Sequence, residues 1–174
     1  MSPEIGGLGD EDICRLPDPV LSRPCVDVDP TDMGVFVLAE AMVNLMREQP
    51  HCVGVAAPQV GQSVRLFVLD VTGHRKAHSQ HGLVVLCNPV VVERSGEEMA
   101  REGCLSVPDL TGDVPRATQI VVGGVEPGTG RTRVIKADAF EARALQHELD
   151  HLDGVLFLDR VRSPSALHQR KTYG

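Results

Sequence analysis

The run from Gln146 to His151 reads Gln-His-Glu-Leu-Asp-His, and it constrains this chain more than any other segment. His147 and His151 are four positions apart, so on an α-helix both imidazoles lie on one face, one turn apart. Two neutral imidazoles in that arrangement can bind one divalent metal ion. Glu148 follows the first histidine, where its carboxylate can take a proton from a metal-bound water. The run therefore predicts a helix that carries a hydrolytic metal centre.

The rest of the sequence bounds the kind of protein that carries this helix. Its 174 residues are enough for one domain with a substantial core. A formal net charge of −7 argues against a dedicated nucleic-acid binder, because phosphate contacts need a basic face. No apolar run approaches the roughly 20 residues that span a bilayer. Residues 1–12 are acidic and contain no Lys or Arg, unlike a secretory signal or a transit peptide. We therefore expect a cytoplasmic protein of bacterial type, with a flexible tail over residues 1–12 and one catalytic domain over residues 13–174.

The cysteines point to a reducing compartment. They number five, an odd count, and no Cys-x-x-Cys pair occurs. A disulfide framework is therefore not expected. One or two of these thiols at most are expected to carry chemistry, and the others to act as small apolar side chains.

The apolar pattern predicts short strands and two helices. An amphipathic helix is expected over residues 31–48, and the histidine-bearing helix over residues 138–152, with Gly154 as its terminator. Strands are expected over residues 64–71, 83–93, 120–125 and 131–137, the last two as a hairpin. Together these elements predict an α+β fold, with small antiparallel or mixed sheets packed around a central metal-binding helix.

Two histidines do not complete a catalytic metal site, which needs a third protein ligand and an open position for water. One class of metallopeptidase places a third histidine three residues after a glycine, but the residue three positions after Gly154 is Phe157. Another class uses a carboxylate on a later helix. Little chain remains after His151, and the acidic residues there, Asp153 and Asp159, are very near the motif. The third ligand is therefore expected upstream.

Two upstream candidates remain open. Cys104 is the better one, because a divalent ion deprotonates a neighbouring thiol and Gly103 allows close approach of the backbone. The second candidate is a set of three histidines in the polar loop over residues 72–82: His74, His78 and His81. Flexible loops rarely preorganise metal ligands, so the simpler interpretation is that these histidines are solvated surface residues.

Three segments together resemble the peptide deformylase family. That family shows Gly-x-Gly-x-Ala-Ala-x-Gln, then Glu-Gly-Cys-Leu-Ser, then Gln-His-Glu-x-Asp-His. This chain has the first over residues 52–59, with Cys52 at the first glycine, and the other two intact over residues 102–106 and 146–151. The resemblance covers about residues 13–162. It implies a peptide-deformylase-like α+β fold. Because the tail after Arg162 is short, the long C-terminal helix that some members have is not expected.

The resemblance also implies a reaction and a metal. The reaction is removal of the N-formyl group from the N-terminal methionine of newly made polypeptides, with release of formate. Cys104, His147 and His151 would hold one divalent metal per chain. Fe²⁺ is the implied metal in the cell, replaceable by Zn²⁺, Ni²⁺ or Co²⁺, and zinc would suit the donor set and bind more tightly than iron.

The same resemblance implies the roles of three further residues. Glu148 would take a proton from the metal-bound water and return it to the leaving amine. The side-chain amide of Gln59 and the backbone N–H of Leu105 would stabilise the negative oxygen of the tetrahedral intermediate.

Other residues are expected to support the site or its substrate. Glu102 and Arg116 would pair and brace the Cys104 segment. Gln146 and Asp150 would be supporting residues. Asp150 lies on a different helical face from the histidines, so it would orient a neighbouring group and not bind the metal. An apolar pocket would take the methionine, with three candidate lining residues: Gly54, Val53 and Leu145.

The expected partners are N-formylmethionyl nascent peptides, and the ribosome near its exit tunnel is a candidate. No membrane partner and no sequence-specific binding of nucleic acid are expected.

Two positions depart from the family pattern. A side chain at Cys52 would be costly if that position needed a positive φ or close backbone packing. Thr111 stands where some members carry an arginine thought to help bind the peptide backbone, which bears on substrate affinity. These departures support one alternative, a non-catalytic or altered-specificity relative of the deformylases. A metal-dependent peptidase is less favoured, because no downstream third ligand exists.

Overall fold

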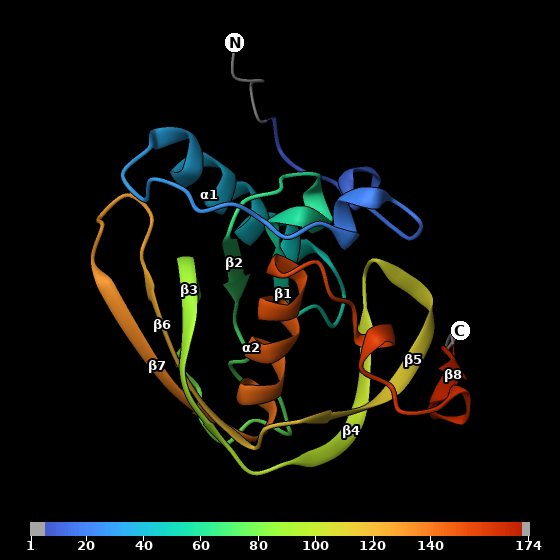
Figure 1. Cartoon of the computed structure of the whole chain (residues 1–174). Helices are drawn as coiled ribbons and strands as arrows, with labels where there is room; N and C mark the ends of the chain where they lie inside the picture. The colour runs from blue at the N-terminus through green and yellow to red at the C-terminus, as the bar shows by residue number, and fades with distance from the viewer. Residues whose placement is uncertain (1–5, 172–174) are drawn as a thin grey trace.

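Two antiparallel sheets flank one central helix in the computed structural model, which describes residues 6–171 (Figure 1). The helices are α1, Met33–Glu48, and α2, Ala139–Leu152. The larger sheet has the strand order β1-β2-β3-β6-β7, and the smaller one β4-β5-β8. The strands are β1 Gly54–Ala56, β2 Leu66–Leu69, β3 Val84–Ser95, β4 Glu98–Cys104, β5 Val107–Arg116, β6 Gln119–Val125, β7 Thr132–Asp138 and β8 Leu167–Gln169. The predicted α+β fold is confirmed.

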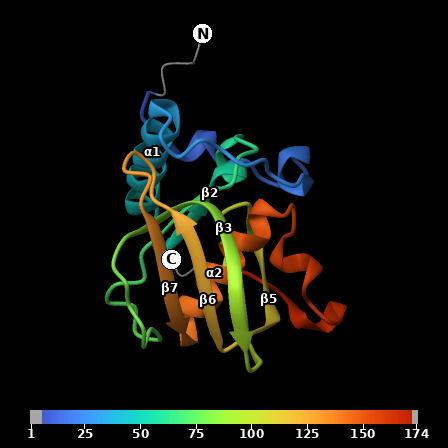
Figure 2. The same ribbon diagram turned by 60° about the vertical axis from the view of Figure 1, so that its left-hand side comes forward.

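The five-stranded sheet buries a different set of side chains on each face. Phe67 and Leu69 of β2 belong to the core cluster that also holds α2, whereas Leu66 and Val68 belong to the cluster that holds α1. This follows from the two-residue period of a strand, which sends successive side chains to opposite faces. The larger sheet is therefore covered by α2 on one face and by α1, over β1 and β2, on the other (Figure 2).

Helix α2 begins and ends close to the predicted positions. Asp138 is its N-cap residue, and the backbone N–H of Gly154 donates to the carbonyl of His151 just beyond its last turn. Gly154 has φ +75°, a conformation that glycine adopts without strain. A Cβ atom there would also lie 2.9 Å from backbone atoms of Ser22 and Arg23. The predicted terminator thus ends the helix and allows the chain near residue 22 to pack against it.

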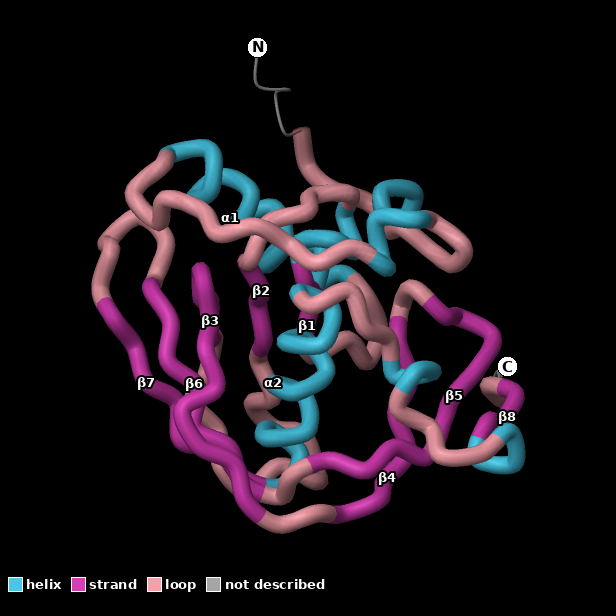
Figure 3. The backbone as a smooth tube through the Cα atoms, viewed as in Figure 1, coloured by secondary structure: helices cyan, strands magenta, loops and turns pink. Residues whose placement is uncertain are grey.

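One long bent hairpin joins the two sheets. Its outer part is β3 paired with β6, and its inner part is β4 paired with β5, so the pairing continues past the bend at Gly96 (Figure 3). The tip is a two-residue turn, with Cys104 paired opposite Val107. Strands β3, β6 and β7 lie where the pattern predicts strands. The tip of the hairpin brings Cys104 to the side of α2.

The smaller sheet was not predicted from the sequence. Three of the seven residues of β4 are charged, and β5 contains two prolines and a glycine, all of which lower β-propensity. The strands form because each pairs along its length with the other, and because β8 pairs antiparallel with β5. After Arg162 the described chain forms the short turn Pro164–Ala166 and then β8.

The N-terminal segment is described only in part. Residues 1–5 lie outside the described residues, Leu8 packs against the α1 cluster, and Asp10–Asp12 form a single 3-10 turn. The predicted extent of the flexible tail stays a prediction. Among the described residues, no helix combines the length and the apolar character needed to span a bilayer.

Candidate metal centre

Cys104, His147 and His151 meet where the hairpin tip reaches α2. One potential ligand atom from each lies within 4.8 Å of the others, and they form the one such group of three or more His, Cys, Asp or Glu side chains within residues 6–171. The Sγ atom of Cys104 is 3.3 Å from Nε2 of His151. The predicted pair of histidines and the upstream cysteine therefore form one three-donor group.

The alternative set of loop histidines does not form such a group. His81 instead pairs with the buried carboxylate of Glu141, with 2.6 Å between Nδ1 and Oε1. The ring of His74 stacks on Phe140 with 3.8 Å between ring centroids. These contacts fix the loop against α2, so packing accounts for the two histidines.

Glu102 fixes the orientation of His147. Its Oε1 atom is 2.9 Å from Nδ1 of His147, which leaves Nε2 of that ring to face the donor group. Arg116 donates to both carboxylate oxygens at 2.9 Å, and Arg143 donates to Oε2 at 2.8 Å. The predicted Glu102–Arg116 pair is thus present and buried. Burial would raise the pKa of Glu102, but His147 and Arg116 lower it to about 2.

The same contacts set the charge state of the ligands. Burial would raise the pKa of the Cys104 thiol, but His151 and His147 hold it well below its usual value. Burial would lower the pKa of His147, but hydrogen bonds to Cys104 and Glu102 raise it well above the usual value. Cys104 therefore favours the thiolate, the form that binds metals, and metal binding would release the proton of His147.

Glu148 lies beside the three donors and has an uncommitted oxygen. It is buried, and burial raises its pKa. Among the described residues its Oε2 atom and Nδ1 of His151 are the buried side-chain polar atoms without a hydrogen-bond partner. A Cβ atom on Gly54 would lie 2.7 Å from Oε1 of Glu148, so only glycine lets the carboxylate occupy this place. An unpaired buried carboxylate oxygen is costly unless it serves a ligand or a water.

Gln59 lies on the other side of Cys104. Its Oε1 atom accepts a hydrogen bond from the backbone of Ala56 at 3.0 Å, which turns the amide nitrogen toward the centre. That nitrogen is 3.4 Å from Sγ of Cys104 and 3.3 Å from Oγ of Ser106. Gln59 is therefore held as a neutral donor next to the ligands.

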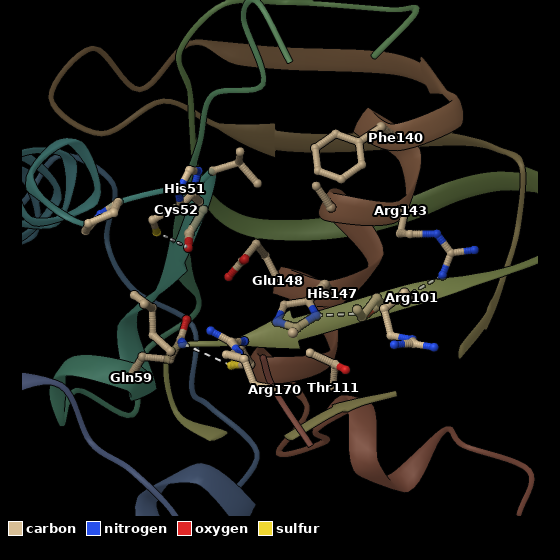
Figure 4. Close-up of a pocket in the computed structure, with 18 residues that line it drawn as sticks. His51, Cys52, Gln59, Arg101, Thr111, Phe140, Arg143, His147, Glu148 and Arg170 are labelled. Carbon is tan, nitrogen blue, oxygen red and sulfur yellow. Dashed lines mark hydrogen bonds and ion pairs between the residues drawn. The ribbon is translucent and has the colours of Figure 1, made fainter. Parts of the chain in front are cut away.

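A cavity of about 370 Å³ opens next to these residues (Figure 4). Gln59, Cys104, Leu105, His147 and Glu148 all line it. The remaining lining residues come mainly from the segment that leads into β1, from β4 and from the first turns of α2: Pro50, His51, Cys52, Val53, Gly54, Arg101, Glu102, Gly103, Thr111, Phe140, Arg143, Ala144 and Arg170. The cavity thus combines one apolar wall with the three donors, a buried base and a neutral amide.

Comparison with known proteins decides the family. The model of the polypeptide deformylase family matches residues 10–166. The chain belongs to the peptide deformylase family. It is 42% identical to a peptide deformylase from Syntrophobacter fumaroxidans, over 86% of this chain and 85% of that protein. It is 44% identical to one from Halothermothrix orenii, over 86% and 92%. The crystal structure of peptide deformylase from Thermus thermophilus superposes with a TM-score of 0.77 at 41% identity, covering 89% of this chain and 88% of that one.

Family membership makes this chain a metal-dependent enzyme that hydrolyses the formyl group of peptides. The three motif segments that resemble the deformylases converge on one centre. The match covers the whole three-donor group and every cavity-lining residue except Arg170.

One predicted pocket residue of this deformylase is wrong. Leu145 does not line the cavity but is fully buried in the core cluster between α2 and the larger sheet. It precedes His147 by two residues and so points about 200° away from it around the helix. The residues that share the face of His147 precede it by three, four and seven positions: Ala144, Arg143 and Phe140. This helical spacing is a signal from which they could have been found.

The two residues that depart from the family pattern, Cys52 and Thr111, both line the cavity. Cys52 is not among the residues with positive φ, and its side chain lines the cavity, with Sγ 3.3 Å from the carbonyl oxygen of Gly54. The left-handed residue is its neighbour His51, at φ +60°. Burial raises the pKa of Cys52 to about 12, so it stays a neutral thiol. Thr111 also lines the cavity, as a β5 residue paired opposite Gly103.

The supporting residues of the deformylase motif contact the hairpin. Asp150 points away from the donors and pairs with Arg116 and Arg160. The amide of Gln146 exchanges hydrogen bonds with the backbone of Ala117 at 2.9 Å, between β5 and β6. Both side chains therefore tie α2 to the strands that carry Cys104. Arg143 also ties α2 to these strands, through its ion pair with Glu102, and this role was not predicted from the sequence.

Proposed function

We propose that this deformylase acts on the N-terminal formyl-methionine of newly made polypeptides, with Cys104, His147 and His151 as the metal ligands. The observation that carries the proposal is the convergence of these donors within 4.8 Å beside Glu148, whose Oε2 atom has no partner in the described chain. A purely structural metal site needs no such base, so the arrangement favours hydrolysis over metal storage.

The donor set fits one divalent metal. Two imidazoles and a thiolate are the ligands of a catalytic site that keeps one position open, and Glu102 orients one imidazole from outside. A metal bound there would polarise a carbonyl oxygen and make a coordinated water more acidic. We propose Fe²⁺ as the metal in the cell, with Zn²⁺, Ni²⁺ and Co²⁺ as replacements. Cys104 beside iron makes the enzyme sensitive to peroxide.

The protein groups around the cavity divide the work of proton transfer and charge stabilisation. Glu148 accepts a proton from the attacking water at Oε2 and returns it to the methionine nitrogen as the carbon–nitrogen bond breaks. Its burial-raised pKa suits it to hold the proton between these steps. The amide of Gln59 and the backbone N–H of Leu105 donate to the oxygen that becomes negative.

The methionine side chain occupies the apolar part of the cavity. Its lining there comes from two segments, Val53 and Gly54 at the start of β1 and Phe140 and Ala144 on α2. Methionine is long, unbranched and polarisable, so it fits an irregular apolar space of this kind. The substrates are nascent chains, which supports action in the bacterial cytoplasm near the ribosome exit tunnel.

Formate release from formyl-Met-Ala-Ser tests the proposal. The protein is loaded with iron under anaerobic conditions, and formate is measured alongside cleavage of an unformylated peptide. We expect formate release and no cleavage of internal peptide bonds. Internal cleavage would support the peptidase alternative, and neither activity in a fully loaded protein would support a non-catalytic relative.

A further inference from the structure

Arg170 lies at the cavity although it comes from the far C-terminal segment. Strand β8 pairs with β5, placing His168 opposite Thr111, and the backbone N–H of Arg170 donates to the carbonyl of Asp109 at 2.9 Å. The strand ladder thus continues to Arg170 and fixes its backbone. Its side chain lines the same cavity as Glu148 and His147.

The guanidinium of Arg170 lies directly over Gly103. A Cβ atom on Gly103 would overlap the Nη2 atom of Arg170 and would lie 3.3 Å from Cζ. The methyl group of Thr111 would lie 3.5 Å from the same Cβ position, so the space over Gly103 is shared by a short side chain and the guanidinium. In Figure 4, Arg170 lies toward the opposite end of the cavity from Phe140, with His147 and Glu148 between them.

This guanidinium has uncommitted donors. Within residues 6–171 the Arg170 side chain makes no hydrogen bond and no ion pair that would hold it in place. The other arginines at the cavity are already paired: Arg101 donates to Asp113 at 2.8 Å and Arg143 to Glu102 at 2.8 Å. A guanidinium offers five N–H donors in a fixed plane. Arg170 is therefore the cavity arginine available to a ligand.

Two sheet edges face each other across the cavity. Strand β1 is the last strand of the larger sheet and β4 is the last strand of the smaller one. Both edges contribute lining residues, including Gly54 and Gly103. Edge strands leave backbone donors and acceptors unpaired, and an extended peptide can pair with them. A peptide that ran between these edges would pass beside the Arg170 guanidinium that covers Gly103.

We propose that Arg170 is a substrate-binding residue that donates hydrogen bonds to the main-chain carbonyl oxygens of the residues after the formyl-methionine. The inference rests on the proposed function of the cavity, because it takes the formyl group to be held at the metal ligands. It assigns the C-terminal strand a part in recognition of the peptide. The residues after methionine contribute to binding through their backbone, so Arg170 does not discriminate between their side chains.

Arg170→Ala tests this with two substrates of different length. For formyl-Met-Ala-Ser amide we expect kcat/KM to fall about 5- to 30-fold through KM, since a hydrogen bond from a charged donor is lost. For formyl-methionine amide, which has no following residues, kcat and KM stay within about twofold of wild type. Arg170→Lys keeps the charge but not the planar fork, so it restores part of the tripeptide affinity.

Arg162→Ala is the matched control. Arg162 is also an exposed arginine near the C-terminus, but it pairs with Glu97 at 2.7 Å and does not line the cavity. We expect both substrates to react normally with this variant. An equal loss for both substrates in Arg170→Ala, or no loss for either, would overturn the inference.

Direct binding separates this inference from the proposed function. Calorimetry with metal-loaded Glu148→Gln protein measures the affinity for uncleaved formyl-Met-Ala-Ser amide, with and without Arg170→Ala. Weaker binding by about 5- to 30-fold supports the role of Arg170, and unchanged binding contradicts it. Failure of wild-type protein to release formate from either substrate would instead refute the proposed function.

Discussion

Glu102 joins the chemistry of the centre to its structure. One buried carboxylate accepts hydrogen bonds from His147, Arg116 and Arg143, which lie on two different elements. It thereby orients a metal ligand and pairs with two buried cations. A buried ion pair that loses one partner is strongly destabilising, because the other charge remains uncompensated. Glu102 is therefore a residue at which metal affinity and stability change together.

Replacing Glu102 with Gln tests this coupling through pH. The pKa of Glu102 is about 2 in the folded chain and 4.5 in its ordinary state, so its ionised form stabilises the fold at neutral pH. That stabilisation, on the order of 3 kcal/mol, is present above the unfolded pKa and is lost as pH falls toward the folded one. We expect the difference in unfolding free energy between metal-free wild type and Glu102→Gln to shrink below about pH 5. Urea unfolding followed by circular dichroism measures it, and a pH-independent difference would contradict the account.

The contact between β1 and α2 is what places the catalytic base. Glu148 projects from α2 against Gly54 at the start of β1. This close approach is possible because glycine has no Cβ atom, which would otherwise collide with the carboxylate. The hairpin of β4 and β5 brings Cys104 to the same helix from the other side. The centre is thus built where two strand segments meet one helix, and small shifts between these elements would separate base from ligands.

Gly54→Ala tests that placement. Its Cβ would lie 2.7 Å from Oε1 of Glu148, so the carboxylate must move. We expect formate release to fall about 100-fold with metal content unchanged, since misplacement of a reacting group by about 1 Å has that effect. The control is Gly123→Ala on β6, where the new Cβ would make only ordinary contacts, the nearest at 3.8 Å. Equal activity of Gly54→Ala and Gly123→Ala would contradict the role of the close approach.

The elements differ in how far the sequence predicts them. Helix α2 and its two histidines follow from local spacing, because the four-residue interval places both rings on one face. Strands β4 and β5 could not be predicted, because their polar residues are held by pairing with each other and with β8. Leu145 was misplaced because its nearness in sequence to His147 does not place it on the same helical face. Arg170 has no local signal, since only the pairing of β8 with β5 brings it to the cavity.

On the scale of the whole molecule, the core cluster between α2 and the larger sheet adjoins the reactive cavity. Leu145 and Phe67 lie in that cluster and do not line the cavity, whereas Ala144 belongs to the cluster, Phe140 packs against it, and both also line the cavity. Helix α2 therefore contributes residues both to the core and to the cavity. A substitution at a residue that contacts only the core, such as Leu145, should alter stability without altering the chemistry.

Leu145→Ala tests whether a change on the core face of α2 leaves the chemistry unaltered. Leu145 is fully buried, so the substitution should lower the free energy of unfolding by about 2–5 kcal/mol through lost burial and a new cavity. The kcat/KM of the folded fraction, assayed at low temperature with correction for the fraction folded, should stay within about threefold of wild type. A large rise in KM without loss of stability would return Leu145 to the substrate pocket and contradict the structure.

The central claim is that a metal held by Cys104, His147 and His151 works together with Glu148 as the base. Metal content and formate release from formyl-Met-Ala-Ser, measured on the same preparations of wild type and Glu148→Gln, test it most directly. The account predicts equal metal content and a loss of formate release of about 100-fold or more in the variant, the usual contribution of a general base. Formate release near the wild-type rate from fully loaded Glu148→Gln would contradict it.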